Sequence, residues 1–151
     1  MTKKHEANKK LEKCLLDKYI QENQFDQTYF FQRIEFKERF IGIDPIMDLN
    51  VSFDGYYKDN NIELFIEVKI SSSIMDYYRI YYQLNKVYLY RKTANPYAQV
   101  VLLLPAIEDD IENLNKTRQS AVERLKNVFM PAITSGLLVI KNIKVTNEDM
   151  K

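Results

Sequence analysis

The sequence predicts an α/β fold in which helices flank a mixed central sheet. Three strand-like segments, at 28–42, 48–57 and 62–71, follow one another after an N-terminal helical segment. The rest of the chain alternates between helical and strand-like patterns. Strands in succession, followed by such alternation, are typical of a mixed sheet with helices packed on it.

The first half of the chain gives the clearest patterns. Positions 3–23 have helical spacing, with lysines on one face and an apolar stripe on the other. The stripe consists of Leu11, Leu15, Leu16, Tyr19 and Ile20. The segment 28–42 is aromatic and alternating, as a strand is, and Asp44–Pro45 breaks it. The next two strand-like segments flank four polar residues, 58–61, and therefore predict a hairpin.

The second half of the chain repeats a helix followed by a strand. The predicted segments are a helix from about 71 to 94, a strand at 98–106, a helix at 108–133 and a strand at 137–145. Serines at 71–73 offer caps for the first of these helices, and Asp76 is expected in its first turn. The run 98–106 is apolar throughout, as in a strand that is buried on both faces. The predicted order is α-β-β-β-α-β-α-β.

The composition is that of one soluble domain spanning residues 1–151. The chain is 46% hydrophobic and 28% charged, which is typical of a globular protein. Its formal net charge of +1 means that any affinity for DNA must come from a local patch. No apolar run approaches the roughly 20 residues of a membrane span, and the start lacks an apolar signal core. We therefore expect a cytoplasmic protein that does not contact membranes.

Two scarce residue types narrow the chemistry. Cys14 is the single cysteine, which excludes an intramolecular disulfide and a zinc site made of cysteines. His5 is the single histidine, which excludes metal sites made of several histidines. The three glycines lie far apart, so there is no glycine-rich phosphate loop. Catalysis, if present, must use carboxylates, lysines, tyrosines or a hard metal ion.

Two carboxylates are predicted to meet on one face of the hairpin. Strand alternation places Glu67 and Lys69 on one face of the second strand. If Asn60–Asn61 is a two-residue turn, Asp54 lies directly opposite Glu67, with Cβ atoms roughly 5 Å apart. Two carboxylates at this distance repel each other unless a cation lies between them. Asp, Glu and Lys on one face therefore suit metal-assisted hydrolysis of a phosphodiester.

The same pattern has a plain structural interpretation. Charged side chains on one face of a hairpin are usually its solvated face, joined by weak surface ion pairs. Glu35-Phe36-Lys37 repeats the Glu-x-Lys spacing without an aspartate on a hairpin partner, so the tripeptide alone is not specific.

With FDG at 53–55 and EVK at 67–69 ending an apolar strand, the sequence resembles the PD-(D/E)xK nuclease superfamily. The predicted α-β-β-β-α-β order resembles the core of that superfamily, the restriction-endonuclease-like fold. The resemblance covers about 3–105, and the C-terminal helix and strand would be additions to the core. One departure is Phe53, which stands where a proline often precedes the aspartate.

The resemblance implies roles for the residues of the motif. Asp54 and Glu67 would ligate Mg²⁺ or Mn²⁺, assisted by the backbone carbonyl of Val68. Lys69 would orient or activate the attacking water.

Members of the superfamily often add two further groups from helices. A glutamate of the first helix often joins the metal site, and Glu12 is the candidate because it lies beside the apolar stripe, with Glu6 as the alternative. Some exonuclease-like members carry a glutamine on the helix after the Glu-x-Lys strand, and Gln83 looks similar. From the sequence alone, Glu12 and Gln83 can equally be surface residues of their helices.

The helix after the hairpin is rich in tyrosine. Its aromatic and basic residues at helical spacings are Tyr77, Tyr78, Tyr81, Tyr82, Tyr88, Arg79, Lys86 and Arg91. Aromatic rings beside basic groups can stack bases and bind phosphates. A stripe of this kind more often packs against a sheet, and we expect that here. The lysines at 3, 4, 9, 10 and 13 can contact phosphates or form a solvated face.

These observations lead to a main hypothesis and two alternatives. The main one is a Mg²⁺- or Mn²⁺-dependent nuclease acting on DNA, with a homodimer or a partner protein supplying further grip. The first alternative is a catalytically inactive protein of the same fold that acts as a binding or regulatory module. The second is a protein-interaction module of an unrelated mixed fold.

Overall fold

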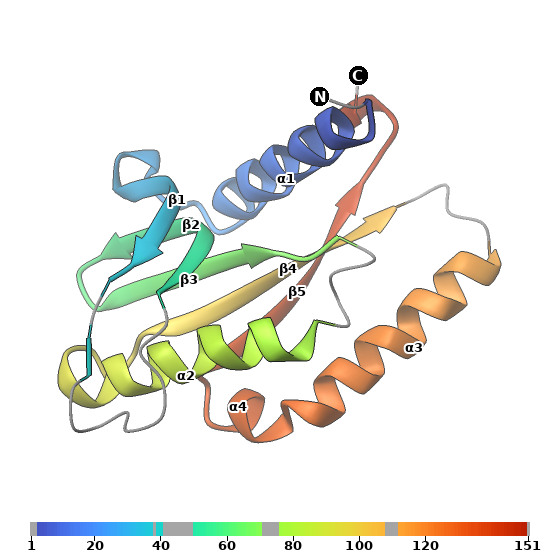
Figure 1. The fold of residues 1–151 in the computed structure, drawn as a ribbon. Helices are drawn as coiled ribbons and strands as arrows, with labels where there is room; N and C mark the ends of the chain where they lie inside the picture. Colours follow the sequence, from blue (N-terminus) through green and yellow to red (C-terminus); the bar gives the residue numbers. More distant parts are fainter. Residues whose placement is uncertain (1–2, 38, 41–49, 71–75, 108–111, 151) are drawn as a thin grey trace.

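Five strands form one mixed sheet in the order β1-β2-β3-β4-β5 (Figure 1). The computed structural model describes residues 3–37, 39–40, 50–70, 76–107 and 112–150. The strands are β1 (Phe30–Phe36), β2 (Val51–Asp59), β3 (Ile62–Val68), β4 (Gln99–Ile107) and β5 (Leu138–Val145). The first three strands pair antiparallel, and β3, β4 and β5 pair parallel.

The helices cover both faces of this sheet. They are α1 (Lys3–Glu22), α2 (Tyr77–Thr93), α3 (Glu112–Val128) and α4 (Met130–Thr134), with short 3-10 helices η1 (Gln27–Tyr29) and η3 (Glu148–Met150). Figure 1 shows α1 on one face and α2, α3 and α4 on the other. The prediction of an α/β fold with a mixed sheet and flanking helices is confirmed. Among the described residues, none of the helices combines the length and apolarity needed to cross a bilayer.

A separate apolar core lies on each face. The α1-side core joins the predicted stripe of α1 to Tyr57, Leu64, Ile66, Val68, Val101 and Leu103 of the sheet. The α2-side core joins Ile80, Leu84 and Val87 of α2 to Phe53, Phe65, Val100 and Leu102. Because β4 contributes alternate residues to both cores, its apolar run has no polar face, as predicted.

The hairpin has the predicted register. Asp59 pairs with Ile62 and Gly55 pairs with Ile66, which places Asn60–Asn61 in a two-residue turn. Asn60 has a φ of 55°, a left-handed conformation that asparagine tolerates well. The described ladder ends at Gly55 and Ile66, one step before the predicted carboxylate pair.

Three predicted boundaries are wrong. The strand expected over 28–42 begins only at Phe30, because Asp26 caps a 3-10 helix by accepting a hydrogen bond from the Thr28 N–H at 2.9 Å. The described strand ends at Phe36, and positions 38, 41 and 42 lie outside the described residues. The helix expected over 108–133 is divided into α3 and α4. Pro131 lies in the first turn of α4, the position where its missing N–H costs nothing. The proposed break at Asp44–Pro45 lies outside the described residues.

The third difference concerns the start of α2. Asp76 is the N-cap and not a residue of the first turn: its Oδ1 accepts a hydrogen bond from the Arg79 N–H at 3.2 Å. The serines 71–73, which we expected to supply caps, lie outside the described residues. The cap fixes where α2 begins, and so which of its side chains face β3.

Candidate active site

Asp54 lies where β2 and β3 cease to pair. Its Oδ2 accepts a hydrogen bond from the Val68 N–H at 2.8 Å, so a side chain takes the place of a backbone partner. The next residue, Lys69, donates its N–H to Leu103 of β4 at 3.0 Å. The end of β3 is therefore held by β4 on one side and by the Asp54 carboxylate on the other.

Beside Asp54, the regular alternation of side chains between the two faces of the sheet is interrupted on β1 and β2. Phe53 and Tyr56 both pack in the α2-side core, although residues three apart on a regular strand face opposite sides. On β1, Arg33 stands across from Asp54 with a φ of 59°, and the described pairing omits this position. A non-glycine residue in the left-handed region is a local strain, and such strain gathers at functional sites.

Glu67 is buried and faces α2. Its side chain is held through one oxygen: Oε2 accepts hydrogen bonds from Gln83 Nε2 at 2.8 Å and from Arg79 Nε at 3.1 Å. Lys69 Nζ lies 3.6 Å from the same oxygen. The other oxygen, Oε1, is buried and has no hydrogen-bond partner in the described part of the chain.

Glu12 approaches the cluster from α1 because Gly55 allows close packing. A Cβ at Gly55 would lie 2.9 Å from the Phe30 ring and 3.1 Å from Leu16, which is one turn after Glu12. The half-buried Glu12 carboxyl lies within hydrogen-bonding reach of Asp54. Glu6, the alternative, is exposed on α1.

The carboxyl groups perturb one another. Burial, followed by the hydrogen bond and charge of Glu67, raises the pKa of Asp54 to about 8, against the opposing effect of the Val68 N–H. Burial also raises the pKa of Glu12, while the nearby Arg33 opposes this shift. Asp54 therefore holds a proton at neutral pH when no cation is bound.

Lys69 is perturbed in the direction that suits proton transfer. Burial lowers the pKa of its ammonium group, and the neighbouring Glu67 carboxylate only partly opposes this effect. The side chain is 2% exposed, so the ammonium group lies within the protein beside Glu67. A lowered pKa makes the buried ammonium group a readier proton donor.

The carboxylate oxygens of Asp54 and Glu67 are the type of ligand that a hard metal ion prefers, although they are not arranged as a complete coordination shell. Among the described residues, no group of three or more His, Cys, Asp or Glu side chains stands ready to hold a metal. The Asp54 carboxylate accepts a hydrogen bond from the Val68 N–H, and the Glu67 carboxylate contacts α2. Mg²⁺ needs only one or two carboxylates, with waters and substrate oxygens completing the shell. The bare Oε1 of Glu67 is an acceptor that such an ion would satisfy.

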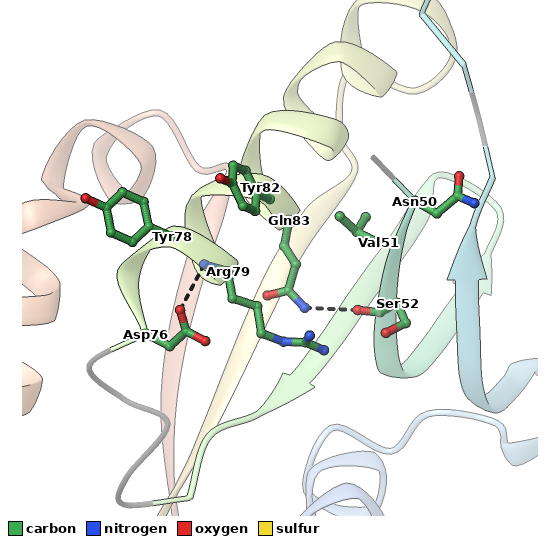
Figure 2. A pocket seen from close by; sticks show the side chains of 8 residues that line it. All are labelled: Asn50, Val51, Ser52, Asp76, Tyr78, Arg79, Tyr82 and Gln83. Atoms are coloured by element: carbon green, nitrogen blue, oxygen red, sulfur yellow. Dashed lines mark hydrogen bonds between the residues drawn. The ribbon is translucent and has the colours of Figure 1, made fainter. Parts of the chain in front are cut away.

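A pocket of about 330 Å³ adjoins Glu67, between the start of β2 and the first turns of α2. Figure 2 shows Gln83 reaching across it from α2 to Ser52, whose carbonyl accepts a hydrogen bond from Gln83 Nε2 at 3.0 Å. Arg79 lies in the same view beside Gln83, and Tyr78 points toward the side away from Asn50. We refer to this hollow as the α2 pocket.

Sequence reasoning did not predict the contact of Arg79 with Glu67 or a role for Arg33, and it misjudged three tyrosines. Arg79 precedes Gln83 by one helical turn, so their common helix face was a signal that both reach Glu67. Arg33 gave no signal, because its left-handed backbone cannot be read from the residue type. The prediction that the tyrosine stripe packs on the sheet is wrong for Tyr78, Tyr81 and Tyr88, which are 78%, 54% and 47% exposed.

The structure thus brings together Asp54, Glu67, Lys69, Gln83 and Glu12, which the sequence selected. No protein-family model, curated protein or solved structure was found that matches the chain. The argument for function therefore depends on the geometry of the site.

Proposed function

We propose that this protein is a Mg²⁺- or Mn²⁺-dependent nuclease of restriction-endonuclease-like fold that hydrolyses DNA phosphodiester bonds. The observation that carries the proposal is the buried Glu67, whose Oε1 lacks a hydrogen-bond partner among the described residues, while Asp54, with its pKa raised to about 8, and the buried Lys69 lie beside it. The antiparallel hairpin followed by a parallel β4 supports the resemblance of fold.

The metal ion, when bound, supplies Lewis acidity at the phosphate and lowers the pKa of a bound water. Asp54 and Glu67 would hold it, with the Val68 carbonyl and with Glu12 as a further carboxylate. Lys69 is placed to orient the attacking water and to exchange a proton with it.

Two residues of α2 would keep the Glu67 carboxylate in position. Gln83 is clamped between Glu67 and the Ser52 carbonyl, so it fixes the orientation of the carboxylate. Arg79 is half-exposed, and its guanidinium can reach a phosphate outside the cluster.

Basic side chains on both sides of the carboxylates support a phosphodiester substrate. Arg33 and Lys9 lie close enough to Glu12 to oppose the rise in its pKa that burial causes, and Arg79 borders Glu67. These basic side chains can contact phosphates locally, although the net charge of the whole chain is only +1.

One observation favours the alternative of a catalytically inactive binding or regulatory module. Arg79 and Lys69 already surround one oxygen of Glu67, and two cations can neutralise a buried carboxylate permanently. In that case the cluster would hold α2 on the sheet without taking up a metal.

Calorimetric titration with Mn²⁺, followed by cleavage assays on single- and double-stranded DNA, separates these functions. We expect the wild-type protein to bind Mn²⁺ and cleave DNA. Asp54→Asn should weaken Mn²⁺ binding and reduce cleavage by about 100-fold or more, the usual cost of losing a catalytic electrostatic group. Asp59→Asn is the matched control at the other end of β2, and it should behave as wild type. A folded wild-type protein that neither cleaves DNA nor binds Mn²⁺, with or without DNA, would establish the inactive module instead.

A further inference from the structure

The α2 pocket has walls of two chemical kinds. Tyr78 and Tyr82, which lie one turn apart on α2, both line it, and the ring of Tyr78, which is 78% exposed, lies at its outer edge on the side away from Asn50 (Figure 2). Polar groups come from Arg79, Gln83 and Asn50. Exposed aromatic rings beside a guanidinium and amides can stack a nucleobase and hydrogen-bond its edge.

Gln83 contributes an unsatisfied atom to this lining. Its Nε2 is fully engaged, by Glu67 and by Ser52, but its Oε1 is buried and has no hydrogen-bond partner among the described residues. A buried acceptor without a donor is costly, and a ligand that brings an N–H group would satisfy it. Nucleobases carry such groups on their edges.

Arg79 connects the pocket to the carboxylate cluster. Its Nε donates to Glu67, while the side chain also lines the pocket and is half-exposed. A phosphate bound by the outer guanidinium nitrogens would lie between the pocket and Glu67. The pocket is therefore next to the position expected for the scissile phosphate.

A second hollow lies on the other side of Ser52 from the α2 pocket. It has a volume of about 380 Å³ and is lined by Asp54, Arg33 and Glu35 among others. Ser52 is exposed and borders both hollows. A strand that leaves the α2 pocket would thus pass the carboxylates and reach Arg33.

We propose that the α2 pocket binds one unpaired nucleotide beside the scissile phosphate, so that the substrate is single-stranded at the site. The volume is at the lower end of the range for small-ligand sites, roughly 300–1,000 Å³. It can take one base with its sugar but not a base pair with two backbones. The proposal rests on the nuclease function proposed above and names its substrate class.

The test is binding of a fluorescent 12-nucleotide single strand, by anisotropy, in low salt with EDTA so that no cleavage occurs. We expect the single strand to bind more tightly than the same sequence in a duplex. Tyr78→Leu should weaken single-strand binding by between about 5-fold and about 100-fold, the range for one lost base–aromatic stack. The matched control is Tyr97→Leu, which removes a 66%-exposed tyrosine outside the pocket and should change nothing. DNA and RNA versions of the oligonucleotide distinguish the sugar.

Each outcome decides between the two proposals. Equal binding of duplex and single strand, or a Tyr78→Leu variant that binds as wild type, overturns the pocket proposal, even if the protein cleaves DNA. Binding that depends on Tyr78 without cleavage in Mn²⁺ keeps the pocket and refutes the nuclease. Absence of both binding and cleavage refutes both.

Discussion

Glu63 and Glu67 are two buried carboxylates on the same face of β3, and their surroundings differ. Each is 2% exposed. Glu63 accepts hydrogen bonds on both oxygens from neutral donors, namely the hydroxyls of Tyr56 and Tyr90 and the amide of Asn95. Arg79, Gln83 and Lys69 all contact Glu67 at Oε2, and two of them are cations. The Asp54 carboxyl lies within hydrogen-bonding reach of Glu67 as well. One carboxylate is complete without a ligand, whereas the other leaves an oxygen for one.

The difference teaches how to separate structural from functional burial of charge. Burial of a carboxylate is costly unless its oxygens are hydrogen-bonded, and Glu63 meets this requirement. Tyr56 remains a donor there, because burial and then Glu63 itself raise the pKa of its hydroxyl. Among the described residues, Glu67 meets the requirement on one oxygen only, and the proposed role as a metal ligand depends on this difference.

The largest expected effect follows from exchanging each of these glutamates for glutamine. Glu67→Gln should reduce Mn²⁺-dependent cleavage by about 100-fold or more. It should also lower stability, because the buried Lys69 ammonium group loses its carboxylate partner. Cleavage rates and thermal unfolding of the purified variants measure both quantities.

Glu63→Gln should lower stability without a loss of cleavage. Loss of hydrogen bonds to a charged group costs about 2 kcal/mol of unfolding free energy. In a domain of this size, that lowers Tm by roughly 4–8 °C. The variant should still cleave DNA at the wild-type rate when it is folded. If Glu63→Gln abolishes cleavage, or Glu67→Gln leaves it intact, the two carboxylates do not divide into structural and functional groups.

A smaller effect is expected on the pH dependence of stability in EDTA. In the folded protein, Asp54 keeps its proton up to about pH 8, whereas an unfolded aspartate ionises near pH ~4. Between these values the folded state binds more protons, so stability is fully present at low pH and falls as pH rises through about 8. Glu12, whose pKa is also raised, adds to the fall with the same sign.

Thermal unfolding between pH 5 and pH 8.5 checks this expectation. Asp54→Asn should flatten the decline in Tm, while Asp59→Asn should keep the wild-type slope. A decline of the same steepness in Asp54→Asn would show that this carboxyl does not carry the proton.

The smallest effect concerns the strain at Arg33. Arg33→Gly should raise stability by up to about 1 kcal/mol, because only glycine adopts the left-handed region without penalty. Asn60→Gly is the matched control at a φ of 55°, and it should gain less because asparagine already tolerates this conformation. DNA binding by Arg33→Gly, measured by anisotropy, should weaken despite the gain in stability. If stability falls or DNA binding is unchanged, Arg33 is not held in strain for substrate contact.

Local sequence patterns predicted much of the framework. The turn at Asn60–Asn61 fixed the hairpin register. Asparagine tolerates the left-handed backbone that a two-residue turn needs, and a turn at these two residues allows only one pairing of the strands. The apolar stripe predicted the packed face of α1, and the unbroken run of β4 predicted a central strand. These features depend on residues close together in the chain, where periodicity and turn chemistry act directly.

The candidate site was predicted only in part, for a physical reason. Asp54, Glu67 and Lys69 came from the hairpin alone, and Glu12 and Gln83 from resemblance. The interrupted alternation of β2 opposite Arg33 and the contact of Arg79 with Glu67 depend on how α1 and α2 pack on the sheet. A prediction from one strand assumes that its side chains alternate regularly between the two faces of the sheet. That assumption fails on β2 between Phe53 and Tyr56.

The sequence by itself determined the order of the elements, the hairpin register and the selection of Asp54, Glu67 and Lys69, because each follows from short-range spacing. Only the tertiary structure decided that Glu67 is buried with one oxygen lacking a partner among the described residues, that Gly55 brings α1 against β2, and that the α2 pocket opens beside the cluster. Burial and close approach arise from packing between segments far apart in the chain, which no local pattern encodes.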